Sequence, residues 1–393
     1  MENSFAGLSH SDLTARGAAW TAREITQQPT IWLEVASLIA RERTRLDGFL
    51  APLLADASLR IVLSGAGTSA FIGDCLAPAL SAHLRRRVDA VATTDLVSGP
   101  HLRMPVDLPT VLVSFSRSGD SPESVAALDL AEQGLASVHH IIITCNAEGA
   151  LATRARSLRN SFVLVLPDAA HDRGFAMTSS FTCMLLTAEL IFGLIRAEAV
   201  APLARSASTL LPHAWPLVQR LVDRGFQRVV YLGSNELRGL ASEAALKLLE
   251  LTDGQIIAVA ESTLGVRHGP KTIINERTLI VVMLSNDSYT RAYDCDLLNE
   301  LRRDARAGGI LALGARRDGV ANGDHLCFAG MSDASDVELA LLHVLVAQSY
   351  ALLQSLALGL TPDRPNSSGV VNRVVQGVVI HPWKRNRGDV PGC

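Results

Sequence analysis

A short aliphatic run, a glycine- or serine-rich loop and a helix-length segment follow one another repeatedly along this chain. We expect the aliphatic runs to be strands, at 60–64, 88–93, 110–114, 140–144, 161–166, 228–232, 255–260, 278–284, 310–313 and 325–328. Strands that alternate with helices pair in parallel, and the helices then cover both faces of the sheet. The pattern therefore predicts an α/β fold of doubly wound parallel sheets in three layers, preceded by a helical segment.

The two halves of the chain resemble each other. IVLSGAGTSAF aligns with VVYLGSNELRG, which places Gly65 opposite Gly233. VLVSFSRSGDS aligns with IVVMLSNDSYT, which places Ser116 opposite Ser285 at nearly the same offset along the chain. Two loops that repeat at nearly one offset indicate an internal duplication of one α/β unit. The second copy has lost the glycine- and serine-rich character, so we expect the two halves to have different tasks.

The length and charge of the chain limit its organisation and its partners. A chain of 393 residues is longer than one hydrophobic core usually accommodates, so two domains are expected. We expect an N-terminal helical segment at 1–45, domains at 46–210 and 211–365, and a C-terminal tail at 366–393. The 36 basic and 39 acidic residues are mixed and form no basic tract, which argues against a nucleic-acid surface.

The cysteines and the apolar segments indicate the compartment. Six cysteines occur without a C-x-x-C pair, so reduced thiols and a cytoplasmic location are expected. The N-terminus lacks a cationic start followed by an apolar core, so we expect no secretory signal. Segment 339–360 has no formally charged residue and is about long enough to cross a bilayer. Polar side chains interrupt it, so a buried helix is favoured over a membrane span.

The loop SFSRSGDSPES follows the strand predicted at 110–114. Ser121, before a proline and a glutamate, is a typical helix N-cap, but a cap explains that serine alone. Ser116, Arg117 and Ser118 lie just upstream of it. Hydroxyls, backbone N–H groups and a helix dipole at the carboxyl end of a parallel strand suit a phosphate monoester. Asp120 argues against an anion here unless its side chain points away.

The loop LSGAGTSAFIGD follows the strand predicted at 60–64. Gly65 and Gly67 permit a tight turn and the close approach of a ligand. The pattern is also a variant of the dinucleotide fingerprint, with Asp89 about 20 residues further on, so a nucleotide cofactor is an alternative. Thr68 and Ser69 add hydroxyls that a dinucleotide loop does not need. Two hydroxyl-bearing loops at one switch point favour a small sugar phosphate and no cofactor.

Two stretches of the second half carry acid–base candidates. Glu243, Lys247 and Glu250 in ASEAALKLLELTDG share one helix face, which is either a solvated ion-pair stripe or a carboxylate base in a cleft. His268 and Lys271 in STLGVRHGPKTII lie in a Gly-Pro turn, where the histidine is a candidate acid–base group. Two of the chain's three lysines fall in these stretches.

Metal and hydrolase motifs are missing from the sequence. It contains no H-E-x-x-H motif and no paired Cys/His spacing, so we expect no metal ion. Asp168, His171 and Asp172 could imitate a ligand cluster, but we expect a surface loop there. A G-x-S-x-G nucleophile elbow is also lacking.

Together, the G-x-G-T-S and S-x-S-G-x-S loops resemble the signature of the sugar isomerase (SIS) family. The strings RGFAMTSSFT, EAALKLLELT, LGVRHGPK and TPDRPNSSGVVNRVVQGV are most similar to AgaS-type galactosamine-6-phosphate deaminase/isomerases, also called tagatose-6-phosphate ketose/aldose isomerases. The isomerase half of glucosamine-6-phosphate synthase is more distantly similar. The resemblance spans roughly residues 20–383 and implies two tandem flavodoxin-like SIS domains. It also implies conversion of D-galactosamine 6-phosphate to D-tagatose 6-phosphate and ammonia.

Other activities of such domains stay open at this point. They are a plain aldose–ketose isomerase, a glucosamine-6-phosphate deaminase and a non-catalytic sugar-phosphate sensor. The family implies that Glu250 moves a proton between C2 and C1 and that His268 assists ring opening, in its own subunit or in a neighbouring one. No metal or redox cofactor is implied, and a homodimer or larger homo-oligomer with shared active sites is expected. The substrate-binding candidates are Thr68, Ser69, Ser116, Arg117, Ser118, Ser121, Lys247 and Lys271.

Overall fold

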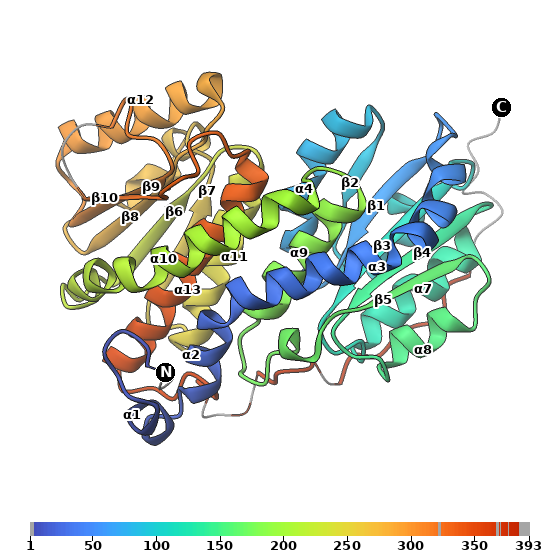
Figure 1. Ribbon diagram of the computed structural model, residues 1–393, viewed down its shortest axis with the longest axis horizontal. Helices are drawn as coiled ribbons and strands as arrows, with labels where there is room; N and C mark the ends of the chain where they lie inside the picture. Colours follow the sequence, from blue (N-terminus) through green and yellow to red (C-terminus); the bar gives the residue numbers. More distant parts are fainter. Residues whose placement is uncertain (1–3, 321–323, 367–368, 370, 376, 385–393) are drawn as a thin grey trace.

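The computed structural model describes residues 4–320, 324–366, 369, 371–375 and 377–384, and in this part of the chain the strands form two five-stranded parallel sheets. The first sheet has the order β2-β1-β3-β4-β5 and the second has the order β10-β9-β8-β6-β7 (Figure 1). The strands of the first sheet are β1 (Arg60–Ser64), β2 (Val88–Ala90), β3 (Thr110–Ser116), β4 (Val138–Thr144) and β5 (Ser161–Val165). Those of the second are β6 (Arg228–Leu232), β7 (Ile257–Glu261), β8 (Thr278–Met283), β9 (Gly309–Gly314) and β10 (Asp324–Cys327).

Helices connect the strands and precede them. The first half contains α1 (His10–Ala15), α2 (Ala19–Thr26), α3 (Gln28–Leu54), α4 (Thr68–Leu84), α5 (Thr93–Ser98), α6 (Pro100–Arg103), α7 (Pro122–Gly134), α8 (Ala150–Arg156), the 3-10 turn η1 (Asp168–Ala170) and α9 (Ser179–Ile191). The second half contains α10 (Ala197–Val222), α11 (Glu236–Leu251), η2 (Gly265–Arg267), η3 (Pro270–Ile273), α12 (Ser288–Asp304) and α13 (Asp336–Ala357).

The predicted α/β class, the parallel sheets and all ten predicted strands are confirmed. One strand is shorter than expected, because β2 ends at Ala90 and Thr93 begins helix α5. The predicted domain borders stay predictions. Two of them fall inside helices, because α3 runs through residue 45 and α10 runs through residue 210.

The duplication is visible in the backbone. A Cβ atom on Gly65 would lie 2.5 Å from the carbonyl oxygen of Ser69, and one on Gly233 would lie 2.4 Å from that of Leu237. Both glycines therefore let a strand turn sharply into its helix. Two residues later, Gly67 has φ 55° and ψ −127°, and Asn235 in the second copy has φ 50° and ψ −117°. An asparagine holds the same left-handed geometry that glycine holds in the first copy.

The two domains share a hydrophobic core. One cluster of buried side chains joins helices α3, α9, α10, α11 and α13 to the facing sides of both sheets. Figure 1 shows these helices between the two sheets. The outer faces have smaller clusters, under α7 and α8 on the first sheet and under α12 on the second. Helix α13 is long and apolar enough to cross a membrane by length and composition, but the whole of its apolar window is buried inside the protein. Burying one such leucine stabilises the fold by about 2 kcal/mol.

After α13 the chain returns to the first domain. The carboxylate of Asp363 accepts hydrogen bonds from the backbone N–H groups of Trp20 and Thr21, at 3.1 and 2.8 Å. Further on, Trp383 packs against Gly134 at the end of α7. Figure 1 shows this C-terminal stretch running from the second domain past α8 to α7.

Candidate active site

The loops after β1 and β3 lie side by side at the carboxyl ends of these two neighbouring strands of the first sheet. These neighbouring strands pair in register from Arg60 with Thr110 to Ser64 with Ser114. The helices that follow them diverge: α4 packs in the shared core against α11, whereas α7 packs on the outer face. Such a switch point at the carboxyl ends of parallel strands is where open α/β sheets bind ligands.

The serine loop, residues 116–121, is held by its own hydroxyl groups. The backbone N–H of Gly119 donates to Ser116 Oγ at 3.0 Å, and that of Asp120 donates to Ser118 Oγ at 3.3 Å. Ser121 is the N-cap residue of α7, as predicted, but its hydroxyl bonds the Ser124 hydroxyl at 2.5 Å and not a backbone N–H group. Across the switch point, the hydroxyl of Ser69 lies 3.9 Å from the sulfur of Met177.

Asp120 points away from this loop. Its Oδ1 accepts a hydrogen bond from the backbone N–H of Ala150, the first residue of α8, at 3.0 Å. A carboxylate at a helix N-terminus is favoured by the helix dipole. Asp120 therefore directs its carboxylate to the neighbouring helix and not to the serine hydroxyls, which answers the objection raised from the sequence.

Arg117 is buried, and its guanidinium group is held by backbone carbonyls. It donates to the Phe175 carbonyl at 3.1 Å and to the Arg373 carbonyl at 2.8 Å. Burial, and then the charge of Arg373, lower the pKa of Arg117, while Asp172 and Glu250 oppose the fall. Glu250 of the second domain thus lies within electrostatic range of the serine loop of the first.

The charged face of α11 is buried and is not a solvated stripe. Glu243 and Lys247 are fully buried, the Lys247 ammonium contacts a Glu250 carboxylate oxygen, and it lies 3.6 Å from Glu243 Oε1. Burial alone would lower the pKa of Lys247, but Glu243 and Glu250 outweigh it and raise the pKa. Burial, with the nearby charge of Glu250, raises the pKa of Glu243 to about 8 even though Lys247 lowers it. Thr68 lies beside Glu243, so α4 of the first domain faces this triad.

The structure does not bring His268 and Lys271 to Glu250 of the same chain. Val266 packs with Leu297 in the cluster under α12, on the opposite face of the second sheet from α11. His268 follows in the turn after η2 and is exposed. The Lys271 ammonium forms ion pairs with two α12 carboxylates, those of Glu300 and Asp304.

Asp172 is buried, so the expectation of a surface loop is wrong at this residue. Its carboxylate accepts hydrogen bonds from the backbone N–H groups of Thr178, Ser179 and Ser180 at 2.8–2.9 Å and so caps α9. Among the described residues, no three His, Cys, Asp or Glu side chains are grouped as metal ligands. No local pattern in the sequence signalled this cap or the contact of Arg117 with Arg373.

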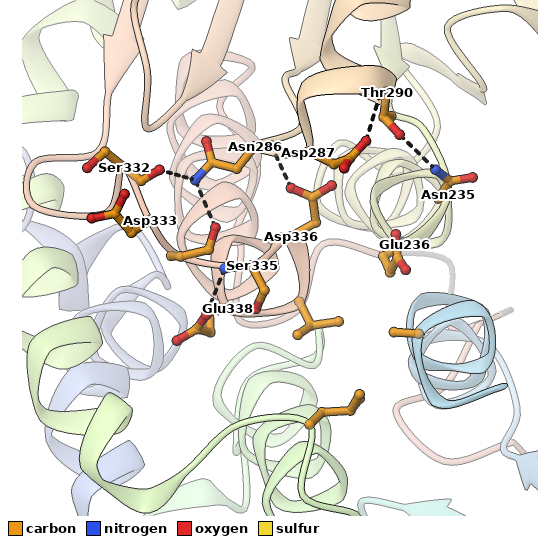
Figure 2. Close-up of a pocket in the computed structure, with 14 residues that line it drawn as sticks. Asn235, Glu236, Asn286, Asp287, Thr290, Ser332, Asp333, Ser335, Asp336 and Glu338 are labelled. Atoms are coloured by element: carbon orange, nitrogen blue, oxygen red, sulfur yellow. Dashed lines mark hydrogen bonds between the residues drawn. The ribbon is translucent and has the colours of Figure 1, made fainter. Parts of the chain in front are cut away.

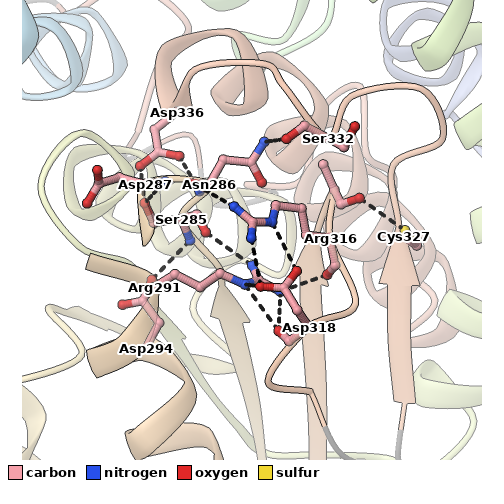
Figure 3. Close-up of polar contacts among 11 residues, drawn as sticks. Ser285, Asn286, Asp287, Arg291, Asp294, Arg316, Asp318, Cys327, Ser332 and Asp336 are labelled. Carbon is pink, nitrogen blue, oxygen red and sulfur yellow. Dashed lines mark hydrogen bonds and ion pairs between the residues drawn. The ribbon is translucent and has the colours of Figure 1, made fainter. Parts of the chain in front are cut away.

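A cavity of about 660 Å³ lies at the corresponding, carboxyl edge of the second sheet. Figure 2 shows its acidic lining, to which Glu236, Asp287 and Asp336 contribute. The carboxylate of Asp336 accepts from the Ser285 hydroxyl and from the Asn286 backbone N–H, the latter at 2.7 Å (Figure 3). In the second domain, the Asp336 carboxylate therefore already accepts hydrogen bonds from the loop that corresponds to the serine loop.

Comparisons with known proteins agree with this architecture. The SIS domain model matches residues 53–193. An AgaS protein of Streptomyces coelicolor is 53% identical over 368 residues, covering 93% of this chain and 96% of its own. D-galactosamine-6-phosphate deaminase AgaS of Escherichia coli is 45% identical over 380 residues, covering 96% and 99%. The crystal structure of tagatose-6-phosphate ketose/aldose isomerase from Escherichia coli superposes with a TM-score of 0.87 at 44% identity, covering 93% of this chain and 97% of that one.

Proposed function

The chain belongs to the SIS domain family, together with the AgaS deaminases, and from this premise we propose that it converts D-galactosamine 6-phosphate to D-tagatose 6-phosphate and ammonia. The observation that carries the proposal is that the serine loop of the first domain lies close to Glu250 of the second domain. The serine loop of the first domain offers hydroxyl and N–H groups to a phosphate, and Arg117 within it lies in range of Glu250 on the second domain. A phosphate grip beside a carboxylate base is what proton transfer in a sugar phosphate requires.

The reaction begins with the bound pyranose. Ring opening, assisted by His268, exposes the C1 aldehyde. Glu250 removes the proton from C2, and the electron pair forms an enolamine, which is then protonated at C1. The resulting iminium at C2 is attacked by water, and the C–N bond breaks to leave a ketone and ammonia. Lys247 holds the carboxylate of Glu250 in place throughout.

His268 acts in this scheme from a second copy of the chain. It is exposed and lies on the face of the second sheet opposite to the α11 side of Glu250, which supports a site completed across a subunit interface. The same location applies to Lys271. We therefore propose a homodimer or larger homo-oligomer with shared active sites.

The free thiols of the described cysteines support a location in the cytoplasm. All five cysteines in the described part of the chain are free, and Cys393 lies outside it. Free thiols persist in a reducing compartment. We therefore place this metabolic enzyme in the cytoplasm.

Coupled detection of ammonia tests the proposed reaction. Galactosamine 6-phosphate should release ammonia and form tagatose 6-phosphate, while glucosamine 6-phosphate should react much more slowly. Ammonia from the gluco epimer alone would reassign the substrate. Interconversion of galactose 6-phosphate and tagatose 6-phosphate without ammonia release would make the protein a plain isomerase. Silence with every substrate, despite binding of a sugar phosphate, would make it a sensor.

A further inference from the structure

The C-terminal segment, residues 371–375 and 377–384, crosses the first domain without forming a helix or strand. Just before it, the Asn366 amide donates to Asp253 at 2.9 Å, a short way past Glu250. Arg373 then reaches the serine loop, and Trp383 packs against Gly134. The chain therefore passes from the end of α11, where Glu250 lies, to the loop that would hold the phosphate.

The side chain of Arg117 is one fastening of this segment. It is 6% exposed, and its two terminal nitrogens donate to carbonyls of different parts of the chain, those of Phe175 and Arg373. The planar guanidinium fork suits two acceptors held apart in this way, and an ammonium does not reproduce it. In return, the guanidinium of Arg373 donates to the backbone carbonyl of Asp172. Two contacts in opposite directions thus join the segment to the body of the first domain.

The turn that receives these contacts is rigidly supported. The carboxylate of Glu24 on α2 accepts from the backbone N–H groups of Arg173 and Gly174, at 2.5 and 3.2 Å. A Cβ atom on Gly174 would lie 2.9 Å from Glu24 Oε2, so a larger residue there would displace the Glu24 carboxylate. Asp172 is fixed as the cap of α9. Arg117 therefore ties the exposed C-terminal segment to a turn that is itself immobilised.

We propose that Arg117 is a positioning residue, whose guanidinium fastens the C-terminal segment beside the serine loop, and not a side-chain ligand of the phosphate. Its backbone N–H group stays with the loop, while its side chain faces the segment. The benefit to catalysis rests on the proposed function, because the fastened segment contacts Arg117 of the loop that we propose holds the phosphate. The fastening itself exists without substrate and is measurable without it.

Limited proteolysis of the ligand-free protein tests the fastening directly. In Arg117→Ala, cleavage by a nonspecific protease within residues 371–375 and 377–384 should become at least about tenfold faster, because hydrogen bonds from a charged donor are lost and the segment detaches more often. Arg117→Lys keeps the positive charge but cannot hold both carbonyls, so it should accelerate cleavage there too. The matched control is Arg291→Ala: Arg291 is likewise buried and donates to the carbonyls of Arg316 and Asp318 in the second domain (Figure 3). It should accelerate cleavage near residue 318 and leave cleavage of the C-terminal segment unchanged.

Unchanged cleavage of the segment in both Arg117 variants would overturn the proposal, whatever the enzyme's substrate proves to be. A second variant, Arg373→Ala, breaks the opposite contact at an exposed residue and should accelerate cleavage in the same segment. In the kinetic assay, Arg117→Lys and Arg373→Ala should each raise KM, and the double variant should raise it little further, because both act through one segment. A wild-type KM in Arg117→Lys, beside a raised KM in Arg117→Ala, would instead assign the side chain to the phosphate.

Discussion

The switch points of the two sheets, called here the first and the second crevice, are built by the same duplicated unit, and they differ in the side chains around them. In the first, the serine loop of the first domain faces Lys247 and Glu250 on α11 of the second domain. In the second, the corresponding loop of the second domain faces the end of α4. The offset that relates Gly65 to Gly233 places Ala79 and Ala82 of α4 opposite Lys247 and Glu250. The second crevice therefore lacks both members of the Lys247–Glu250 ion pair.

The loop donors have also been reassigned. In the second crevice the Asp336 carboxylate accepts hydrogen bonds from the Ser285 hydroxyl and the Asn286 N–H. Glu236 and Asp287 add further negative charge to the lining. An anionic phosphate is repelled by such a lining. Both copies thus share a backbone that can turn around a ligand, while their side chains differ, and we expect only the first copy to hold a phosphate. A change in the first crevice can therefore be compared with a matched change elsewhere in the same chain.

The largest effect is expected from Glu250→Gln. Removing the base should lower kcat for ammonia release by about 10²–10⁴-fold, the range of general acid–base catalysis, while binding of tagatose 6-phosphate by calorimetry is retained. The matched control is Glu236→Gln in the second crevice, which should keep kcat. Normal turnover by Glu250→Gln would remove the base assignment.

The same variant tests whether sites are shared between subunits. Glu250→Gln and His268→Ala subunits, each inactive alone, should regain activity when dissociated and mixed. In randomly mixed dimers about a quarter of the wild-type activity is expected, because half of the dimers contain one intact site of two. If mixing restores nothing, although hybrid dimers are detected by mass spectrometry, His268 does not act from the partner.

Much of the difference between the two domains could be predicted from the sequence, because strand spacing, loop composition and helix periodicity are local signals. The repeat placed Gly65 opposite Gly233, and the serines of SFSRSGDSPES stood out from LSNDSYT. What could not be read were contacts between distant segments. The neutral or charged state of Glu243 depends on burial between two domains, and the partner of Arg117 lies 256 residues away along the chain. Asp120 was ambiguous because only the fold shows that it caps α8.

The next largest effect is expected in phosphate binding. Replacing Ser118 and Ser121 together by alanine should raise KM by about 10–100-fold, since hydrogen bonds to a charged group are lost. The matched pair in the second crevice is Asp287→Ala with Thr290→Ala. It should leave KM unchanged and lower the free energy of unfolding by about 1 kcal/mol, because Asp287 caps α12. Equal KM values for the two double variants would mean that the serine loop does not select the phosphate.

The smallest effect is expected in the pH dependence of the free energy of unfolding, where Glu243 beside the first crevice should contribute and the corresponding residue of the second crevice should not. Glu243 has a pKa of about 8 in the folded chain, above the ordinary value of 4.5, whereas Cys75 takes the corresponding position in the other copy. Between pH 5 and 8 the folded chain keeps a proton on Glu243 that the unfolded chain releases. The free energy of unfolding therefore falls as pH rises through this window.

In Glu243→Gln this fall should be shallower, as measured by urea unfolding at pH 5, 6, 7 and 8. Part of it should remain, because Glu24 also has its pKa raised to about 8, mainly by burial and then by Asp172. The exposed Glu198→Gln on α10 is the control and should reproduce the wild-type slope. A wild-type slope in Glu243→Gln would mean that Glu243 is ionised in the folded chain. The triad of Glu243, Lys247 and Glu250 would then hold two carboxylates against one lysine and carry a net negative charge.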